Sequence, residues 1–515
     1  MNILFFNNPS ENVVVEYPDE AGESFLEIGD FGYFPPLGLL YILSYLEKHL
    51  PGHNLVLKDC PAEEITQDDI EQLVADLQPD IVAMTSYTIS LLDIVISARA
   101  IRRAKPDVYI CLGGHHPTAF PYQAAQLKEF DSIVVGEGEI AFTELVKALE
   151  SGDDVNQIEG VYTETSIERW RKNSLRDNRF LHTVIAPPAY VEDIDSLPPP
   201  NREYIKNIDY HSVVGVSSKL ATIISSRGCP YLCTFCDVPF KRYRQRSHKL
   251  VVDEMEACLE LGYEEFHFYD DLFNIQPKKI LGFCDEIDRR GLKVVWDFRG
   301  RVNGVNRESL ERAKKSGLRM ISFGVETGSN EGLKILKKGT KVTKILETFD
   351  LCHELGIVTV VDFMIGLPHE RSRQDVIDNI KFAIGLDPDH IQFSILNLYP
   401  GTEIHAQAVS QGVAKQDHWE QYILDPQPGF AVEHWDEYLT VKEMVELHKY
   451  AYRRFYLRPR YILKSIFQTK SVHEFKVKAK GAFTIAGFNK IPGRSLGGLS
   501  WFKSEKEKAV VQSVE

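Results

Sequence analysis

Three cysteines stand close together in the segment SSRGCPYLCTFCDVP, at Cys229, Cys233 and Cys236. Thiolates are the usual ligands of iron–sulfur clusters, and a cluster with four irons normally takes four of them. With three protein ligands, one iron keeps an open coordination position that a small molecule can fill, as in catalytic zinc sites. The spacing therefore predicts a [4Fe–4S] cluster whose fourth iron binds a substrate or cofactor.

The spacing argues against a zinc site with four protein ligands. Such a site needs a second ligand pair, and no further CxxC pair stands in the sequence. The glycine and proline of RGCPYLC favour a tight backbone in which neighbouring thiols converge. The other cysteines occur singly in predicted strands or helices and are expected to be buried small hydrophobic residues: Cys60, Cys111, Cys258, Cys284 and Cys352.

The cysteine segment follows the first strand of a repeating pattern. Short apolar stretches predict six strands, and helical stretches separate them: ATIISS, EFHFY, KVVWDF, MISFGV, VTVVDFMIG and HIQFSI. Six β/α units predict a partial (β/α)6 TIM-like barrel over residues 221–404. Active sites of such barrels lie at the carboxyl ends of the strands. The three cysteines are therefore expected on that rim.

A second alternating pattern fills residues 1–150. NILFF, NLVLKD, DIVAMTS, VYICLGG and DSIVVGE predict buried strands with helices between them, which is typical of a doubly wound Rossmann-like parallel sheet. Ligands bind such sheets at the carboxyl ends of the strands, where the turns TSYT, GGHHPT and GEGE are expected. GxGxxG is absent after the first strand, so a dinucleotide is not the expected ligand.

The remaining residues predict a linker and a helical end. Proline clusters in residues 151–220 interrupt regular elements and predict a structured linker. Residues 405–515 predict a mainly helical region that ends in a loop and a frayed tail. The fold class is therefore α/β, and a chain of 515 residues exceeds what one hydrophobic core usually serves.

Charge is unevenly distributed. The net charge of −15 argues against a general nucleic-acid binder. From Ala451 onward the chain carries 14 Lys or Arg against 4 Asp or Glu, so this tail is about +10 and the remainder about −25. We expect the tail to dock on the acidic body, although an anionic substrate or a membrane surface would also fit.

Several features favour a cytoplasmic protein. No window approaches about 18 uninterrupted apolar residues, so no membrane span is expected. MNILFFNNPS lacks a basic start and predicts a buried first strand rather than a signal peptide. The scattered cysteines suit a reducing compartment.

The CxxxCxxC loop after the first barrel strand, with Phe235 before the last cysteine, resembles the radical S-adenosylmethionine (SAM) superfamily. The resemblance extends over residues 220–400. It implies that the three cysteines hold a [4Fe–4S] cluster and that SAM chelates the open iron through its amino and carboxylate groups. It also implies that the reduced cluster cleaves SAM to methionine and a 5′-deoxyadenosyl radical, which abstracts hydrogen from a substrate.

The same resemblance implies SAM contacts at the ends of successive strands. Asp270 and Asp271 would face the methionine amino group, an arginine of WDFRGR the carboxylate, and Glu326 the ribose hydroxyls, while FMIGLP would pack against adenine. A strand-end carboxylate is about as often a helix cap or a surface charge, so that reading stays open. The expected SAM-binding residues are Phe235, Asp270, Asp271, Arg299, Arg301, Glu326, Ile365 and Gly366.

A doubly wound domain upstream of such a barrel resembles the cobalamin-binding domain of one large branch of the superfamily. The segments PPLGLLYI, TSYT, GGHHPT, GEGE and FYLRPRYIL match that branch. The string DxHxxG, which supplies a cobalt-ligating histidine in many cobalamin carriers, is absent. The resemblance thus implies cobalamin without that ligand, with direct ligation by His115 or His116 the less favoured alternative. The expected cobalamin-binding residues are Gly38, Thr85, Ser86, Tyr87, Gly113, Gly114, His115, Gly136, Glu137 and Gly138.

Together these resemblances imply a cobalamin-dependent radical SAM enzyme of the methyltransferase-like branch. It would methylate an unactivated carbon of a small or lipid-like substrate, using the 5′-deoxyadenosyl radical and methylcobalamin. An oxidative cyclase or ring-rearranging enzyme with the same cofactors is one alternative, and a non-catalytic cobalamin or SAM sensor is another. The intact cysteine triplet speaks against the sensor. An external one-electron reductant, of flavodoxin or ferredoxin type, is the expected protein partner.

Overall fold

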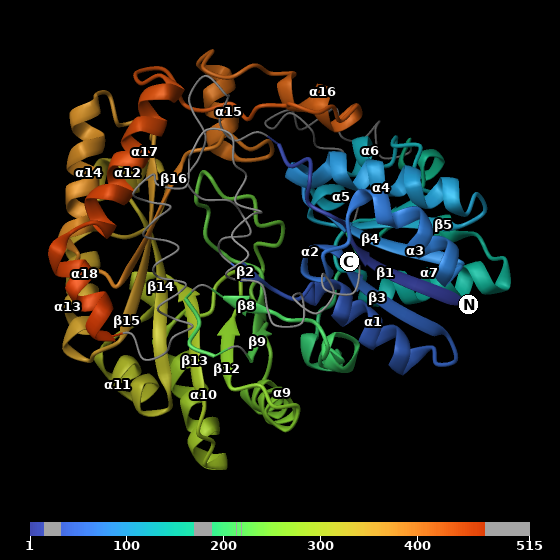
Figure 1. The fold of residues 1–515 in the computed structure, drawn as a ribbon, viewed down its shortest axis with the longest axis horizontal. Coiled ribbons are helices and arrows are strands. Elements are labelled where there is room, and N and C mark those ends of the chain that lie inside the picture. The colour runs from blue at the N-terminus through green and yellow to red at the C-terminus, as the bar shows by residue number, and fades with distance from the viewer. Residues whose placement is uncertain (15–31, 169–187, 213, 218, 469–515) are drawn as a thin grey trace, which may run out of the picture.

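Two six-stranded sheets organise the chain, one in each of two neighbouring halves (Figure 1). The C-terminal helices α15 (Glu403–Ser410) and α16 (His418–Leu424) lie above both halves. The computed structural model describes residues 1–14, 32–168, 188–212, 214–217 and 219–468.

The N-terminal sheet has the strand order β3-β1-β4-β5-β6-β7 and is parallel except for the pairing of β7 with β6. Ile3 and Phe5 pack on one face of the sheet, and Leu4 and Phe6 pack on the other, so the strand is apolar throughout. The doubly wound sheet predicted from the sequence is confirmed. Its strands are β1 (Asn2–Asn7), β3 (Asn54–Asp59), β4 (Ile81–Ser86), β5 (Tyr109–Gly114), β6 (Ser132–Val134) and β7 (Val161–Tyr162).

Helices cover both faces of this sheet. The first face carries α1 (Leu37–His49) and α7 (Gly138–Ser151), and the second carries α3 (Ile70–Leu77) and α4 (Leu91–Ala104). Short elements complete this half and the connection to the next: α2 (Cys60–Glu63), α5 (His115–Ala119), α6 (Pro121–Ala124), β2 (Gly32–Tyr33) and β8 (His211–Ser212).

The predicted linker packs against the first domain at several described positions, and it also contacts the barrel through Arg202, which pairs with Glu254 of α9 (His248–Glu260). The strand β7 lies after residue 150 and extends the N-terminal sheet. Ala189 bridges to Gly136 at the end of β6, and the Tyr210 hydroxyl donates to the Asp59 carboxylate at 2.8 Å. The antiparallel pair of β2 with β8 ties the linker to the segment before α1.

The second sheet is parallel, and its strands neighbour one another in chain order, β9-β12-β13-β14-β15-β16. This is the predicted six-unit partial barrel, and its helices lie on the outside of the sheet. The strands are β9 (Leu220–Ile223), β12 (Glu265–Phe268), β13 (Val295–Gly300), β14 (Leu318–Glu326), β15 (Val358–Ile365) and β16 (His390–Ile395). The helices are α9 (His248–Glu260), α10 (Pro277–Arg290), α11 (Arg307–Lys315), α12 (Asn330–Ile335), α13 (Val342–Glu354) and α14 (Arg373–Gly385).

The C-terminal helix α17 (Val441–Tyr456) covers β16, the last strand of the barrel. An edge strand leaves backbone groups unpaired, and these need partners when they are buried. The backbone N–H groups of Ile391 and Phe393 donate to the hydroxyls of Tyr456 and Tyr452, each at 3.2 Å. The Tyr456 hydroxyl in turn donates to the Ile391 carbonyl at 2.8 Å. Side chains of α17 therefore satisfy the edge that an incomplete barrel exposes.

The C-terminal region is mainly helical, as predicted, and its last described element is α18 (Pro459–Gln468). Trp419, Tyr422 and Ile423 of α16 pack against Leu91 and Phe120, which joins this region to the first domain. The predicted loop and frayed tail, and most of the basic tail, lie outside the described residues. No described helix combines the length and the apolar character that a bilayer crossing requires.

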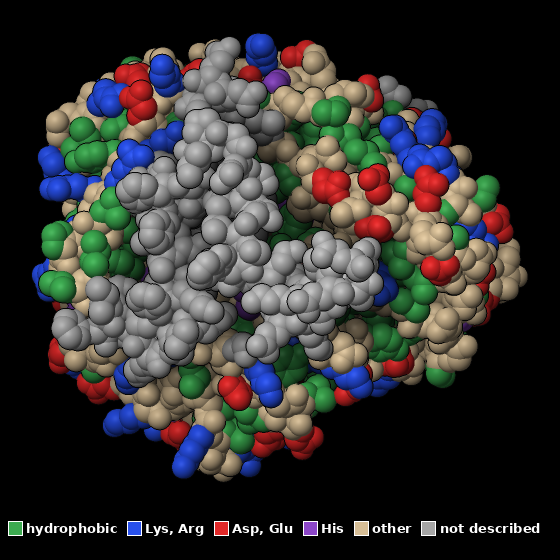
Figure 2. Space-filling model, viewed as in Figure 1, with side chains coloured by type: hydrophobic (Ala, Val, Ile, Leu, Met, Phe, Trp, Pro, Cys, Tyr) green, Lys and Arg blue, Asp and Glu red, His purple; other side chains and the backbone are tan. Residues whose placement is uncertain are grey.

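The surface carries both signs of charge. On the face drawn in Figure 2, acidic and basic side chains occur over both halves, and the described residues there form no continuous basic area.

The inner face of the barrel is polar at its N-terminal end. Phe266 and Trp296 point outward into the core under the helices, so the alternate residues Glu265, His267 and Asp297 point inward. His267 Nδ1 lies 3.1 Å from an Asp297 oxygen, and Arg319 Nη2 lies 3.0 Å from Glu265 and 3.4 Å from Asp297.

These four residues form a closed network at the barrel floor. Glu265 also accepts the backbone N–H groups of Val216 and Ser217. Burial alone would lower the pKa of His267, but Asp297 and Glu265 outweigh it and raise the pKa to about 9. With His267 protonated the network is electrically neutral, which allows it to be buried.

We expect His267 to make the stability of the barrel depend on pH. Its pKa is raised from 6.5 to about 9, so its contribution is complete below pH 6.5 and is lost as pH rises through about 9. The loss amounts to at most about 3 kcal/mol. Unfolding measured between pH 6 and 10 should show this decline in the wild type and a flatter profile in His267→Gln. His353→Gln, on the exposed end of α13, should keep the wild-type profile; equal profiles for both variants would contradict the assignment.

Candidate active site

The three cysteines lie in a loop that a short hairpin closes. β10 (Ser226–Arg227) pairs with β11 (Arg244–Gln245), and the loop between them starts directly after the first barrel strand. The Cys229 N–H donates to the Phe240 carbonyl at 3.0 Å, and the Cys236 N–H donates to the Cys233 carbonyl at 3.1 Å. All three thiols are partly exposed, whereas the five other cysteines are buried, as predicted. The loop therefore presents three thiols and no other sulfur ligand.

Glycine is required immediately before the first cysteine. Gly228 has φ +82, and a Cβ placed on it would meet the Arg242 carbonyl oxygen at 2.3 Å. Its N–H donates to Asp271 at 2.8 Å. At the other end of the loop, Thr234 is buried and exchanges backbone hydrogen bonds with Leu336 and Ile404. The loop is thus fixed to both the strand ends and the C-terminal helices.

The Asp270 carboxylate, predicted to face SAM, is already engaged. It accepts the N–H of Ser225 at 2.6 Å, the hydroxyl of Ser226 at 2.6 Å and the Lys279 ammonium at 3.0 Å. The ion pair with Lys279 is almost wholly buried. The structure therefore favours Asp270 as the anchor of the hairpin that carries the cysteines, and leaves Asp271 as the acid that borders the open space.

The two arginines of WDFRGR differ in burial and in their contacts. Arg301 is buried, donates from Nη1 to Cys233 Sγ at 3.3 Å, and lies 3.9 Å over the ring of Tyr231. Its Nε is buried without a partner among the described residues. Arg299 is exposed on the inner face of the barrel and lies over Tyr269 at 5.5 Å. Arg301 is therefore the arginine beside the cysteines, where an anionic cluster would find a compensating charge.

Glu326 adopts a strained conformation at the end of β14. Its φ of +71 is unusual for a residue with a side chain, and such strain persists where the surroundings enforce it. Its carboxylate pairs with the buried Lys338 ammonium at 3.0 Å, and that ammonium lies 5.6 Å from the centre of the Phe235 ring. The structure brings Glu326 and Phe235, two of the expected SAM-binding residues, to either side of a lysine that the sequence analysis did not single out.

The predicted adenine contacts are not brought to the site. Ile365 is completely buried in the core under the helices, so its side chain points away from the barrel interior. Gly366 has φ +79, and a Cβ on it would meet Met444 Sδ at 2.5 Å, so local packing explains this glycine. Met364, the alternate residue of β15, packs with Phe235 instead.

A cavity of about 270 Å³ lies between the two domains. Seven of the ten predicted cobalamin residues line it, namely Gly38, Thr85, Gly113, Gly114, Gly136, Glu137 and Gly138. A Cβ on Gly38 would meet nothing within 4 Å, and one on Gly113 only the Met84 carbonyl at 3.8 Å. The missing side chains of these two glycines therefore leave space in the cavity rather than relieve a clash. A bulky ligand that approaches the backbone fits this wall.

The barrel side of the same cavity belongs to the cysteine hairpin. Ser226, Arg227, Gly228, Tyr269 and Asp271 line it. Gly228 immediately precedes Cys229, so the cavity connects the predicted cobalamin wall with the predicted cluster loop. Both sites are thus built around one space.

The other predicted cobalamin residues do not line this cavity. His115 Nε2 lies 3.3 Å from Asp237, the residue after the last cysteine, and its ring stacks with that of Tyr87. His116 is completely buried with Nδ1 at 3.0 Å from the Thr88 hydroxyl, and burial lowers its pKa to about 3. Ser86 is also buried. Neither histidine lines the cavity, although His116 Nε2 is buried without a hydrogen-bond partner among the described residues.

Glu137, predicted to contact cobalamin, forms buried ion pairs with arginines of the cysteine hairpin. It is 8% exposed and pairs with Arg244 at 2.7 Å and with Arg227 at 3.0 Å. It also accepts the Val191 N–H at 2.7 Å. Burial alone would raise its pKa, but Arg244 and Arg227 outweigh burial and lower it. Arg227 also pairs with Glu139, so two acids of GEGE clamp the hairpin that carries the cysteines.

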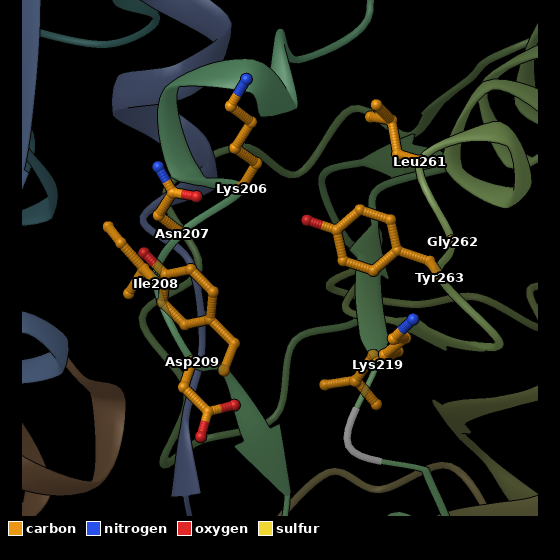
Figure 3. Close-up of a pocket in the computed structure, with 10 residues that line it drawn as sticks. Lys206, Asn207, Ile208, Asp209, Lys219, Leu261, Gly262 and Tyr263 are labelled. Carbon is orange, nitrogen blue, oxygen red and sulfur yellow. The ribbon is translucent and has the colours of Figure 1, made fainter. Parts of the chain in front are cut away.

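A second cavity, of about 290 Å³, lies away from the cysteines (Figure 3). Figure 3 shows Lys206 and Asn207 of the linker on one side, facing Leu261 and Tyr263 on the other. Its lining includes no cysteine and no residue from the carboxyl end of a strand. Its size alone does not make it the active site, because no chemistry-bearing cluster borders it.

Comparison with known proteins agrees with this geometry. Residues 223–383 match the family model of the radical SAM superfamily, and residues 31–146 match that of the B12 binding domain. The chain is 30% identical over 484 residues to an uncharacterized methyltransferase, PH0819, of Pyrococcus horikoshii, covering 93% of this chain and 96% of that protein.

Two further proteins share most of the chain. The anaerobic magnesium-protoporphyrin IX monomethyl ester cyclase of Rubrivivax gelatinosus is 25% identical over 496 residues, which cover 93% of this chain and 84% of the cyclase. The structure of the radical SAM methyltransferase TsrM from Kitasatospora setae, with cobalamin and a [4Fe-4S] cluster bound, superposes with a TM-score of 0.65 at 18% identity and covers 94% of this chain and 99% of TsrM.

We expect Glu137→Gln to loosen the junction between the domains. It removes the charge that compensates buried Arg244, and breaking a buried pair costs about 3–5 kcal/mol. Hydrogen exchange of residues 136–139 and 226–228 should accelerate together by more than about 100-fold. Arg242→Gln breaks the exposed pair of Arg242 with Glu192 and should cost less than about 1 kcal/mol. Equal effects of the two substitutions would show that the clamp does not hold the junction.

Proposed function

The chain belongs to the cobalamin-dependent radical SAM family, and from this premise we propose that it is a methyltransferase that methylates an unactivated carbon of a small molecule. Its cofactors are a [4Fe–4S] cluster, SAM and cobalamin. When bound, the cluster and SAM supply a radical that removes hydrogen from carbon, and cobalamin supplies the methyl group.

One observation carries the proposal: the cavity between the domains is lined both by the glycine turns of the first sheet and by the hairpin that carries the cysteines. Radical generation and methyl delivery must act on one carbon, so the groups that perform them must face a common space. Gly113 and Gly136 border that space from one side, and Gly228 and Asp271 from the other. A sensor that only binds the cofactors has no need for this arrangement.

Different residues of the chain bind the cluster and SAM in this proposal. Cys229, Cys233 and Cys236 hold the cluster, and Arg301 places a positive charge at Cys233. Burial raises the pKa of the Cys229 and Cys236 thiols, so iron binding has to displace their protons. The Lys338–Glu326 pair and Phe235 border the same rim and are the proposed contacts of SAM.

The proposal requires an external one-electron donor of the flavodoxin or ferredoxin type. All eight cysteines of the chain lie in described segments, and the five outside the loop are single and buried. They provide no second cluster that could relay electrons through the protein. Cyclases among the relatives make ring closure the outcome that an experiment has to exclude.

Anaerobic incubation with reductant, cobalamin and SAM carrying a deuterated methyl group tests the activity. We expect 5′-deoxyadenosine and a product that contains the deuterated methyl group. Replacing all three loop cysteines with serine should reduce bound iron from about four atoms to none and abolish both products. Cys352→Ala, in the outer core, should retain the iron. A product of changed mass without deuterium would support the cyclase or rearrangement alternative, and unchanged turnover in the serine variant would refute the cluster.

We expect Gly113→Val to weaken cobalamin binding without unfolding the domain. Valine suits the end of a strand, and the space beside Gly113 is open, so the side chain would fill the room proposed for the ligand. Overpacking costs about 1–3 kcal/mol, which corresponds to a loss of affinity of roughly 10- to 100-fold. Cobalamin absorbance of the purified protein measures this loss, and Gly385→Ala at the end of α14 is the control. Full cobalamin content in Gly113→Val would place the ligand elsewhere.

A further inference from the structure

A polar row crosses the inner face of the barrel between its floor and its rim. Arg299 of β13, Ser322 of β14, Asp362 of β15 and Gln392 of β16 make up this row. Arg299 is in register with Ser322, and Asp362 with Gln392. Each is followed or preceded by a phenylalanine that packs in the outer core, Phe298, Phe323, Phe363 and Phe393. The alternation of β-strands therefore directs the four polar side chains inward.

The two charged residues of the row, Arg299 and Asp362, do not pair with each other. No ion pair joins them among the described contacts, and Arg299 has no described hydrogen-bond partner. Asp362 accepts one long hydrogen bond, from the Ser322 hydroxyl at 3.4 Å. Burial raises the pKa of Asp362 to about 6, even though the positive charge of Arg299 opposes that shift. Charged side chains on an inner face are costly to leave without partners, so a polar ligand that bound to both would be stabilised there.

Arg299 lies beside an aromatic pair. Its guanidinium lies 5.5 Å from the centre of the Tyr269 ring, and the Phe34 ring packs on Tyr269 at 5.0 Å. A cation–π contact of this kind favours the position of the guanidinium over the ring and occupies none of its N–H groups with a hydrogen bond. Tyr269 also lines the cavity between the domains. Arg299 is therefore placed where the interior of the barrel meets the space proposed for the cofactors.

We propose that Arg299 and Asp362 bind the substrate, and that this substrate is a small hydrophilic molecule carrying a carboxylate or phosphate together with a hydroxyl or amino group. The guanidinium binds the anionic group in a bidentate manner. Asp362 accepts a hydrogen bond from the hydroxyl or amine. The inference rests on the proposed function and narrows it, because a lipid with an apolar reacting end would not suit this row.

The test uses the full-length protein with cluster and cobalamin, a reductant and SAM with a deuterated methyl group. A small-molecule extract of the source organism is separated into an anionic fraction, in which zwitterions that carry a carboxylate or phosphate are included, a neutral fraction of uncharged molecules and a lipid fraction, and each is supplied as substrate. We expect deuterated methyl only in the anionic fraction. A phosphatase-treated portion of that fraction distinguishes a phosphate from a carboxylate: the labelled compound disappears in the first case and persists in the second.

Substitutions at the row supply the second arm. Arg299→Gln should lower kcat/KM for the labelled compound by about 10- to 100-fold, mainly through KM, and Arg299→Lys should restore part of it. Asp362→Asn should also raise KM. Iron and cobalamin contents of the variants report whether they fold. Arg373→Gln, on the exposed surface of α14, is the control.

Each outcome has a distinct meaning. Label in the neutral or lipid fraction alone, or wild-type kcat/KM in Arg299→Gln, would overturn this inference and leave the proposed function intact. Absence of 5′-deoxyadenosine and of label from every fraction would overturn the proposed function, and this inference with it.

Discussion

The buried ion pairs of Glu137 with Arg227 and Arg244 hold together two domains that each carry half of the site. Charges removed from water are costly, and their attraction offsets that cost only in a fixed geometry. The clamp therefore tolerates little sliding between the domains. Glu137 follows Gly136 in the turn of the first sheet, and Arg227 lies two residues before Cys229. The ion pair between these two residues lies only a few residues from both the glycine turn and the cysteine loop. It therefore fixes the position of one relative to the other.

A second set of buried charges fixes the cysteine loop to the barrel. Asp270 binds the N–H and hydroxyl of Ser225, the hydroxyl of Ser226 at the start of β10 and the Lys279 ammonium of α10. Four hydrogen bonds to one buried carboxylate make it a rigid support. The neighbouring Asp271 holds the Gly228 N–H, so two consecutive acids at one strand end fix consecutive parts of the loop. The loop needs such support, because its own sequence forms almost no regular structure.

The sequence predicted the two sheets and the cysteine loop because hydrophobic periodicity and ligand spacing are local signals. Side-chain roles that depend on distant partners could not be predicted in the same way. Asp270 and Glu137 stand in turns typical of ligand binding, yet each carboxylate is occupied by residues that are remote in the sequence: Ser226 in one case, Arg244 in the other. Lys338 and Asp362 carry no motif, and only the folded barrel brings them near Glu326. Ile365 shows that a shift of one residue along a strand moves a side chain to the opposite face of the sheet.

That alternation also determines how the barrel interior can be reached. At the N-terminal end, Glu265, His267, Asp297 and Arg319 neutralise one another and bind the backbone of the linker, so the floor is filled by charges with partners. One layer higher, no described ion pair involves Arg299 or Asp362, and Asp362 accepts only a long hydrogen bond from Ser322. At the rim, Arg301 contacts Cys233. Because the charges of the floor compensate one another, the proposed substrate would enter the barrel from the rim, past the cysteine loop and the cavity between the domains. This direction of entry would place its outer end beside both proposed cofactor sites, which is the geometry that the proposed methyl transfer requires.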